Sequence, residues 1–308
     1  YVAGVDENNV EQVLEDIIKA GADIIFCVGP QMMPNSLKVA VEHPEVYILN
    51  CSLNAPHPYI RTYYGRMYEA KFLAGMIAGA VTDNERVAYI ADYPIYGMIA
   101  NINAFALGVA SVNPRAKVYL AWSKTKDYDR NKFLTENDLH YVSDQDIITP
   151  NDASRYFGLY KLQDGQALNL AMPIWNWGVF YEKLLQSVLA GSYKAEGQEQ
   201  VKALNYWWGM SAGVIDLICS KHVPYGVKRL ADHLKSDITK GEVVPFFGQI
   251  YDQKGELKNK GEHEMKPSDI MKMDWLVDNV VGSIPPMSEF VDNAKMVVEL
   301  KGVEENKL

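Results

Sequence analysis

The sequence predicts an α/β protein built from two doubly wound, Rossmann-like lobes around a cleft. Its 308 residues, 48% of them hydrophobic, suffice for two medium domains with apolar cores. Short apolar runs alternate with segments of helical period, which is the rhythm of βα units. Asn113-Pro114 interrupts this series, and it resumes at Val118. We therefore expect a first lobe over residues 1–113, a second over 114–245 with a possible crossing back near 205–218, and a C-terminal hairpin and helix extension over 246–308.

The first lobe shows the alternation most clearly. The run Ile-Ile-Phe-Cys-Val after Asp23 is continuously apolar, as expected of a parallel strand that is buried on both faces. Apolar residues from Val10 to Ile18 recur with helical period, and Gly21 is placed to end that helix. The expected strands are 1–5, 23–28, 46–49, 60–64 and 87–91, and the expected helices are 9–21, 35–43, 68–81 and a last one that ends near residue 110.

The remaining residues continue the same pattern less regularly. The segment from Phe246 predicts a hairpin that turns near Gln253-Lys254-Gly255, and Pro267 is placed to begin a helix. The other expected strands are 118–122, 140–143 and 166–172. The other expected helices are 129–137, 177–190, 225–240 and 267–281, with a helix or turn at 153–160.

Composition excludes several classes of function. The formal net charge of −9 argues against nucleic acid as a direct partner, because phosphate binding needs clustered Lys and Arg. No apolar run reaches the roughly 20 residues of a membrane span. Three cysteines without CxxC spacing and six scattered histidines give no metal-ligand pattern. A Walker sequence and a GxGxxG after a strand are both absent. We therefore predict no metal site and no cofactor.

Polar and aromatic residues follow the expected strands, where ligands bind in open α/β sheets. Carboxylates and amides there can bind hydroxyl groups, and aromatic rings can stack on a flat ligand. For each such residue a capping or packing role is an open alternative. The candidate binding residues are Gly29, Pro30, Gln31, Cys51, Ser52, Asn54, Asp92, Tyr93, Tyr96, Asp144, Gln145, Trp175 and Trp177.

One segment points to a different chemistry. Residues 209–213, Gly-Met-Ser-Ala-Gly, match the G-x-S-x-G pattern of a hydrolase nucleophile elbow, with Ser211 as the nucleophile. Such an elbow needs a strand before the serine, a helix after it, and then an Asp and a His. Asp216, Asp232, His233 and His263 are available for those roles, but the segment before Ser211 is short. A serine hydrolase is therefore the alternative prediction.

The order of several short motifs resembles the basic-membrane-protein family, the purine-nucleoside-receptor-like substrate-binding proteins of ABC transporters. Residues 69–75, Glu-Ala-Lys-Phe-Leu-Ala-Gly, are similar to the family's E-x-x-F-L-A-G helix start. The strand at 87–91, the crossover at 113–118 and the Gly-Glu at 241–242 follow in the family's order. The resemblance covers roughly residues 1–245. It implies a type I periplasmic-binding-protein fold, a small-molecule ligand such as a nucleoside, and a transporter permease as partner.

Two departures from the family qualify this implication. Compared with the family pattern, the chain is expected to start at the second strand, so the fold would lack the first βα unit and leave the central slot of the first sheet vacant. Residues 172–177, Met-Pro-Ile-Trp-Asn-Trp, have no carboxylate where the family holds a sugar-binding Asp. A related subset carries the same body behind a regulatory region, as an intracellular sensor. The resemblance implies the extracytoplasmic face of the plasma membrane for a lipoprotein-like receptor and the cytoplasm for such a sensor.

Taken together, the sequence predicts a non-enzymatic protein whose two lobes close on a small ligand such as a purine nucleoside. Closure would then be read by an ABC-transporter permease or by a fused regulatory region.

Overall fold

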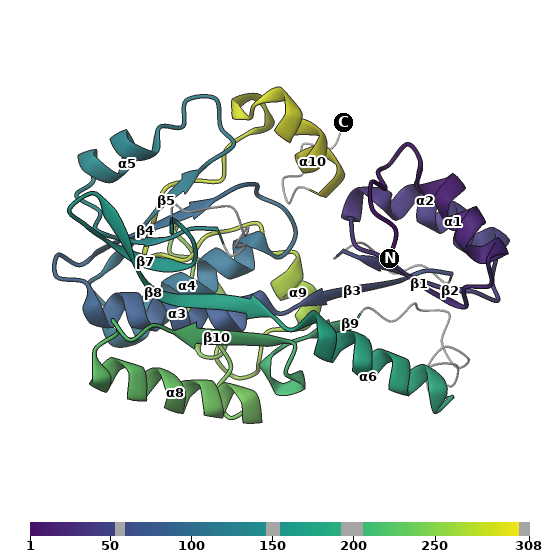
Figure 1. Ribbon diagram of the computed structural model, residues 1–308. Helices are drawn as coiled ribbons and strands as arrows, with labels where there is room; N and C mark the ends of the chain where they lie inside the picture. The colour runs from purple at the N-terminus through teal and green to yellow at the C-terminus, as the bar shows by residue number, and fades with distance from the viewer. Residues whose placement is uncertain (53–58, 146–154, 192–205, 302–308) are drawn as a thin grey trace. The chain divides into compact units, whose positions relative to one another are not determined.

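The structure is a computed structural model that describes residues 1–52, 59–145, 155–191 and 206–301 (Figure 1). The chain divides into two compact units. Unit 1 contains Tyr1–Gly65 and Trp177–Trp208, and unit 2 contains Arg66–Asn176 and Gly209–Leu308. The chain therefore passes between the units at residues 65–66, 176–177 and 208–209. We call these passages the first, second and third connections.

Unit 1 is a parallel sheet with helices on both faces. Its described strands lie in the order β1-β2-β3-β9, and each pairs in parallel with its neighbour. Ile25 and Cys27 of β1 join the apolar core under α1 and α2, whereas Phe26 contacts the rings of Tyr63 and Tyr181 on the other face. The elements are α1 (Val10–Lys19), β1 (Ile24–Cys27), η1 (Pro30–Met32), α2 (Met33–Glu42), β2 (Tyr47–Cys51), β3 (Arg61–Gly65), α6 (Trp177–Leu189) and β9 (Tyr206–Trp208).

Unit 2 is built on a mixed sheet with the order β10-β8-β7-β6-β4-β5-β13. Strands β6, β4, β5 and β13 pair in parallel, but β7 pairs antiparallel with β6 and β8, and β10 pairs antiparallel with β8. Its strands are β4 (Arg86–Ala91), β5 (Lys117–Trp122), β6 (Tyr141–Ser143), β7 (Leu159–Gln163), β8 (Gln166–Trp175), β10 (Ile215–Cys219) and β13 (Val280–Val281), with the hairpin β11 (Gln249–Tyr251) and β12 (Leu257–Lys260). Its helices are α3 (Met67–Val81), α4 (Met98–Val112), α5 (Arg130–Glu136), η2 (Met210–Ala212), α8 (Tyr225–Lys240), α9 (Pro267–Met271), η3 (Met287–Glu289) and α10 (Asp292–Lys301).

The prediction of an α/β protein with parallel strands and covering helices is confirmed, but the unit boundaries differ from 113 and 245. Strands β4 and β5 pair along their length across residue 113, and β13 pairs with β5 across residue 245. Only residues 1–65 of the expected first lobe belong to unit 1, where β9 adds the last strand of the sheet and α6 packs on one face of it. The vacant central slot is also not found, because β1 and β2 pair directly from Ile24–Tyr47 to Cys27–Asn50.

Three predicted elements are wrong. Residues 1–5 form no strand and are mostly exposed. The helix-or-turn segment at 153–160 contains the start of β7 at Leu159, and residues 153–154 lie outside the described ranges. The helix from Pro267 ends at Met271, because Asn103 holds the backbone that follows. The Asn103 side chain donates to Trp275 O at 2.8 Å and accepts from Val277 N at 3.0 Å.

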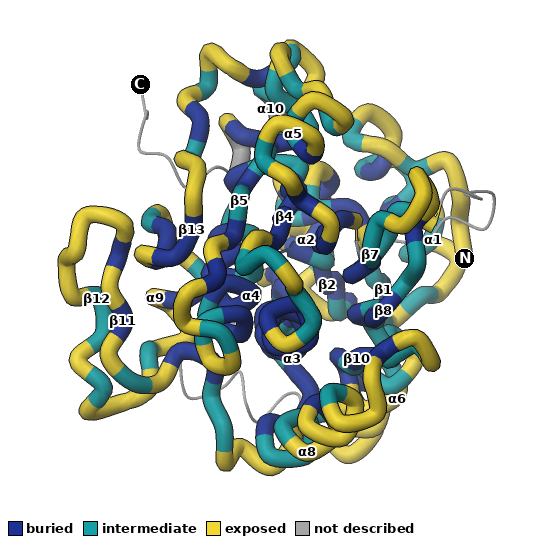
Figure 2. Tube along the Cα trace, turned by 90° about the vertical axis from the view of Figure 1, so that its left-hand side faces the viewer, coloured by how far each residue is buried: buried dark blue, intermediate teal, exposed yellow. Residues whose placement is uncertain are grey.

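Close packing of α3 on α4 forms the centre of unit 2; α3 is almost wholly buried, and α4 is buried over most of its length (Figure 2). Small residues make this approach possible. A Cβ on Gly75 would lie 2.8 Å from the carbonyl carbon of Phe105 and closer still to its oxygen. A Cβ on Gly108 would meet the Phe72 carbonyl in the same way. The small-residue pattern of these helices therefore reflects a backbone-to-backbone contact.

We predict that Gly75→Ala lowers the free energy of unfolding by about 2 kcal/mol or more, because the new methyl group can be accommodated only if the two helices separate. Gly226→Ala is the matched control, since it lies in helix α8 with no heavy atom within 4 Å of the added Cβ. Urea unfolding followed by circular dichroism measures both. Equal stability of the two variants would contradict the helix contact.

Candidate functional site

The carboxyl edge of the unit 1 sheet gathers five of the predicted binding residues. Gly29, Pro30 and Gln31 follow β1, and Cys51 and Ser52 stand at the end of β2. Because β1 and β2 are parallel, these residues share one edge of the sheet. Asn50, which was not predicted as a site residue, joins the two loops by donating from Nδ2 to Gly29 O at 3.0 Å. Asn54 lies outside the described residues.

This edge contains buried polar atoms that lack partners. Asn50 is fully buried and Ser52 is 3% exposed. Neither Asn50 Oδ1 nor Ser52 Oγ has a hydrogen-bond partner within the described part of the chain. Leaving a buried polar atom unpaired costs about 1–3 kcal/mol, so such atoms are uncommon unless a ligand or water satisfies them. Cys27 is a poor candidate for chemistry at this edge, because burial raises the pKa of its thiol.

The carboxyl edge of the unit 2 sheet gathers another group of predicted residues. Asp92 follows β4, Asp144 and Gln145 follow β6, and Trp175 ends β8. These three strands run in the same direction, so all four residues lie at one edge. Strands β8 and β4 are three positions apart in the sheet, which corresponds to about 14 Å. Ser123 after β5 donates a hydrogen bond to Asp92.

A charged cluster surrounds Asp144. Its other members, Arg130 and Tyr160, were not predicted from the sequence. Arg130 at the start of α5 lies 2.9 Å from Asp144 Oδ2, and Tyr160 of β7 donates to the same oxygen at 3.0 Å. Gln145 N donates to Oδ1 at 2.9 Å. Burial raises the pKa of Asp144, while Arg130 and these hydrogen bonds oppose that change. Burial also raises the pKa of Tyr160, so its hydroxyl stays protonated and donates.

A second cation at the same edge comes from helix α3. Lys71 of α3 is 1% exposed, and its Nζ donates to Ser143 Oγ at 3.2 Å. The ammonium also lies 5.0 Å from the centre of the Tyr89 ring. The sequence does carry a signal for this site. Lys71 stands in the mostly apolar run from Met67 to Gly79, which has no polar face that could hold a lysine in solvent.

Two predicted aromatic residues have packing partners within their own units. Tyr93 packs against the cluster of Phe290, Ala294 and Val298 from the C-terminal segment of unit 2. Trp177 of α6 lies 5.7 Å from the Tyr63 ring in unit 1. Trp175 differs from both, because its Nε1 is buried and has no partner within the described ranges. Tyr96 is half-buried in the loop before α4.

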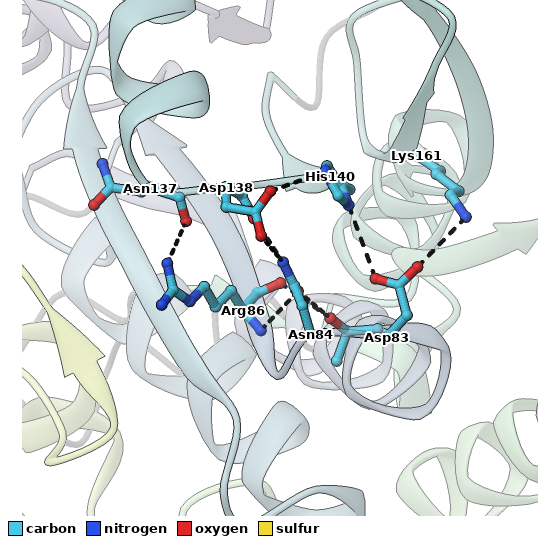
Figure 3. Close-up of polar contacts among 8 residues, drawn as sticks. Asp83, Asn84, Arg86, Asn137, Asp138, His140 and Lys161 are labelled. Carbon is cyan, nitrogen blue, oxygen red and sulfur yellow. Dashed lines mark hydrogen bonds and ion pairs between the residues drawn. The ribbon is translucent and has the colours of Figure 1, made fainter.

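A separate polar network closes the opposite, amino-terminal edge of the unit 2 sheet (Figure 3). Asn84 donates from Nδ2 to Asp138 O at 2.7 Å, and Arg86 at the start of β4 donates to Asn137 O at 3.0 Å. His140 stands between Asp138 at 3.3 Å and Asp83 at 3.8 Å. These side chains are largely exposed, and their bonds tie the β4 loop to the end of α5. We therefore assign them a structural role.

Within the described ranges, no group of three or more His, Cys, Asp or Glu side chains could hold a metal ion. No helix of the described chain is both long and apolar enough to cross a membrane.

The decisive comparison is with protein families. The model of the Bmp family, described as ABC transporter substrate-binding protein PnrA-like, matches residues 1–156, which is just over half of the chain. The chain belongs to this PnrA-like family. The resemblance inferred from residues 69–75 and the motifs around them is thus confirmed.

Individual relatives of this PnrA-like protein are distant. A purine-binding protein of Brucella abortus is 26% identical over 290 residues, which cover 90% of this chain and 81% of that protein. A putative ABC transporter glucose-binding protein of Haloferax volcanii is 29% identical over 227 residues, covering 70% of this chain and 56% of that protein.

Solved structures share the fold of the PnrA-like chain. A solute-binding protein of an ABC transporter system from Conexibacter woesei has a TM-score of 0.54 at 17% identity, covering 78% of this chain and 84% of that one. A transcriptional activator of the comK gene from Bacillus halodurans has a TM-score of 0.57 at 15% identity, covering 78% and 87%. These likenesses support the periplasmic-binding-protein fold.

The G-x-S-x-G segment of this PnrA-like protein does not form a nucleophile elbow. Ser211 lies in the short helix η2, and strand β10 follows where an elbow needs a helix. Asp216 pairs with Lys235, and His233 contacts Asp237 at 4.0 Å. Among the described residues, Ser211 has no hydrogen bond to a histidine. The hydrolase alternative is therefore not favoured.

We predict that Arg130→Ala destabilises the protein more at pH 7 than at pH 4. The variant leaves Asp144 buried without its cation, which raises the pKa of that carboxyl further. A protonated Asp144 does not need the cation, so the difference from wild type is small near pH 4 and grows as the pH rises through the folded-state pKa. We expect a loss of about 1–3 kcal/mol at pH 7, since Arg130 is partly exposed.

Urea unfolding at both pH values measures this effect, with the exposed Lys132→Ala of the same helix as control. A loss for Arg130→Ala that does not change between pH 4 and pH 7 would contradict the electrostatic explanation.

Proposed function

We propose that this protein captures a purine or purine nucleoside for an ABC transporter, without catalysing a reaction. Membership of the substrate-binding family supports the general role, and the relative described as a purine-binding protein supports the ligand class. The observation that carries the proposal is a pair of buried oxygens at the carboxyl edge of unit 1, Asn50 Oδ1 and Ser52 Oγ, which have no hydrogen-bond partner among the described residues. Both oxygens can accept hydrogen bonds, and the Ser52 hydroxyl can also donate one.

The proposed binding residues lie on both carboxyl edges. In unit 1 the backbone of Gly29 approaches a ligand, and Ser52 and Asn50 supply polar contacts. In unit 2 Trp175 offers a ring face together with a buried Nε1–H donor that has no partner in the described part of the chain. Asp144 is already bonded to Arg130 and Tyr160, which orients its carboxylate before a ligand arrives. The other candidates for direct contact are Pro30, Gln31, Cys51, Asp92, Tyr96 and Gln145.

We propose that binding works by closure of the two units around a ligand that contacts both. The three connections at 65–66, 176–177 and 208–209 support this proposal, because a rotation of one unit would need only a few backbone torsions to change. A ligand that contacts both units binds the closed state better and so shifts the population toward it. A permease or a regulatory region would then read the closed state.

Isothermal titration calorimetry with inosine, adenine and glucose tests the ligand class. The proposal expects binding of inosine or adenine and none of glucose. Glucose binding alone would move the assignment to sugars, and binding of none of the three would remove the purine proposal. A thermal shift with the same compounds gives an independent measure, because a ligand stabilises the state that it binds.

We predict that Ser52→Ala weakens purine binding about tenfold, as expected for one lost hydrogen bond, without lowering the stability of the free protein. The Ser52 hydroxyl has no partner within the described chain, so its removal costs no internal bond. Ser36→Ala is the matched control: Ser36 is also buried in unit 1, but its hydroxyl already donates to Cys27 Sγ at 3.3 Å. The control should keep its affinity and lose some stability. The opposite pattern would exclude Ser52 from the site.

A further inference from the structure

A buried carboxylate fixes the unit 2 ends of two connections. The first connection enters unit 2 at Arg66, and the third enters at Gly209. Glu69, in the first turn of α3, is 6% exposed and accepts a hydrogen bond from Met210 N at Oε2, at 2.6 Å. Arg66 Nη1 lies 3.4 Å from the other carboxylate oxygen. Residues 141 positions apart in the sequence are thus joined where two separate connections begin.

The Glu69 carboxylate lies so close to Gly209 that any larger residue at this position would force the carboxylate to move. A Cβ on Gly209 would lie 2.6 Å from Glu69 Cδ and closer still to both carboxylate oxygens. The φ angle of Gly209 is −124°, which other residues also adopt, so glycine is favoured here by the space beside the Glu69 carboxylate and not by backbone strain. The Glu69 carboxylate therefore lies directly against the backbone of Gly209 and Met210.

The second connection joins the same segment. Asn176, its last residue in unit 2, donates from Nδ2 to Gly213 O at 3.0 Å and from its backbone to Val214 O at 2.7 Å. Gly209 O in turn accepts from Ala212 N and Val214 N, each at 3.2 Å. The short segment 209–214 therefore links all three connections, and Glu69 anchors its first residues to α3.

A carboxylate is a costly way to fill this position. Burial raises the pKa of Glu69, which the Met210 N–H and Arg66 only partly oppose. Apolar side chains of similar volume are often as stable as a buried ion pair, or more so. Stability alone therefore does not explain why a carboxylate occupies this position. The directional hydrogen bond that it accepts from Met210 N does explain the choice of a polar side chain.

We propose that Glu69 is a positioning residue for ligand binding, and that its carboxylate fixes the direction in which the first and third connections leave unit 2. This proposal rests on the proposed function, since it assigns Glu69 to the closing motion and not to ligand contact. Loss of the carboxylate frees the 209–214 segment, widens the range of arrangements that the free protein samples, and lowers the share that can close on a ligand.

A double-mutant cycle tests the proposal, with Glu69→Ala, Gly209→Ala and the combined variant. Glu69→Ala should raise the hydrogen-exchange rate of the Met210 amide about tenfold and weaken inosine binding by about the same factor. Gly209→Ala should weaken binding as well, because its methyl group meets the carboxylate. The combined variant should bind better than Gly209→Ala alone, because the clash is gone. Glu69→Gln, which keeps an acceptor for Met210 N, should stay close to wild type.

Small-angle X-ray scattering of the free proteins provides a readout that needs no ligand. Glu69→Ala should increase the maximum dimension, and the exposed Glu136→Ala should leave it unchanged. Faster Met210 exchange with unchanged scattering and unchanged affinity would show a merely local role and overturn the proposal. A combined variant no better than Gly209→Ala would overturn it too. If wild type binds no purine, the proposed function fails, and the scattering and exchange results still decide whether Glu69 fixes the connections.

Discussion

The architecture of unit 2 depends on the contact between helices α3 and α4, in which backbone meets backbone at Gly75 and Gly108. Helix α3 packs against α4, α8, β8 and β10 and is buried almost throughout, so its polar groups need partners inside the protein. The two charged residues of its first turns are both used in this way. Glu69 bonds the backbone that follows the third connection, and Lys71 bonds Ser143 at the carboxyl edge of the sheet. One helix thus joins the packing core, the connections and the candidate site.

The two carboxyl edges prepare for a ligand in different ways. In unit 2 the charged groups are paired in advance: Asp144 is bonded by Arg130, Tyr160 and its own neighbouring backbone, which offsets part of the cost of burial. In unit 1 the polar groups are neutral, and Asn50 and Ser52 keep unpaired oxygens within the described chain. Neutral groups tolerate this far better than charges do. The arrangement suits a neutral, hydrogen-bonding ligand better than a strongly charged one.

Much of the fold could be predicted from local sequence. Continuous apolar runs and helical periodicity located β1, β4, β5, α3, α4 and α8 within one to a few residues, because these elements are decided by burial pattern and end signals. The unit boundaries could not be predicted in this way. They depend on which strands pair, and the pairing of β13 with β5 joins residues about 160 positions apart. The helix expected at 267–281 failed for a similar reason, since the bonds from Asn103 that end it come from another part of the chain.

The candidate site shows the same limit at the level of single residues. Sequence reasoning proposed Ser52, Asp92, Asp144 and Trp175 as site residues because each follows a predicted strand, and that rule depends only on local order. It did not find Arg130, Tyr160 or Lys71, which reach the edge from a helix start, an antiparallel strand and a buried helix. Their roles follow from the electrostatics of burial. Once Asp144 is buried at the end of β6, a nearby cation is required to keep it charged, and the fold must supply that cation from whichever element passes close by.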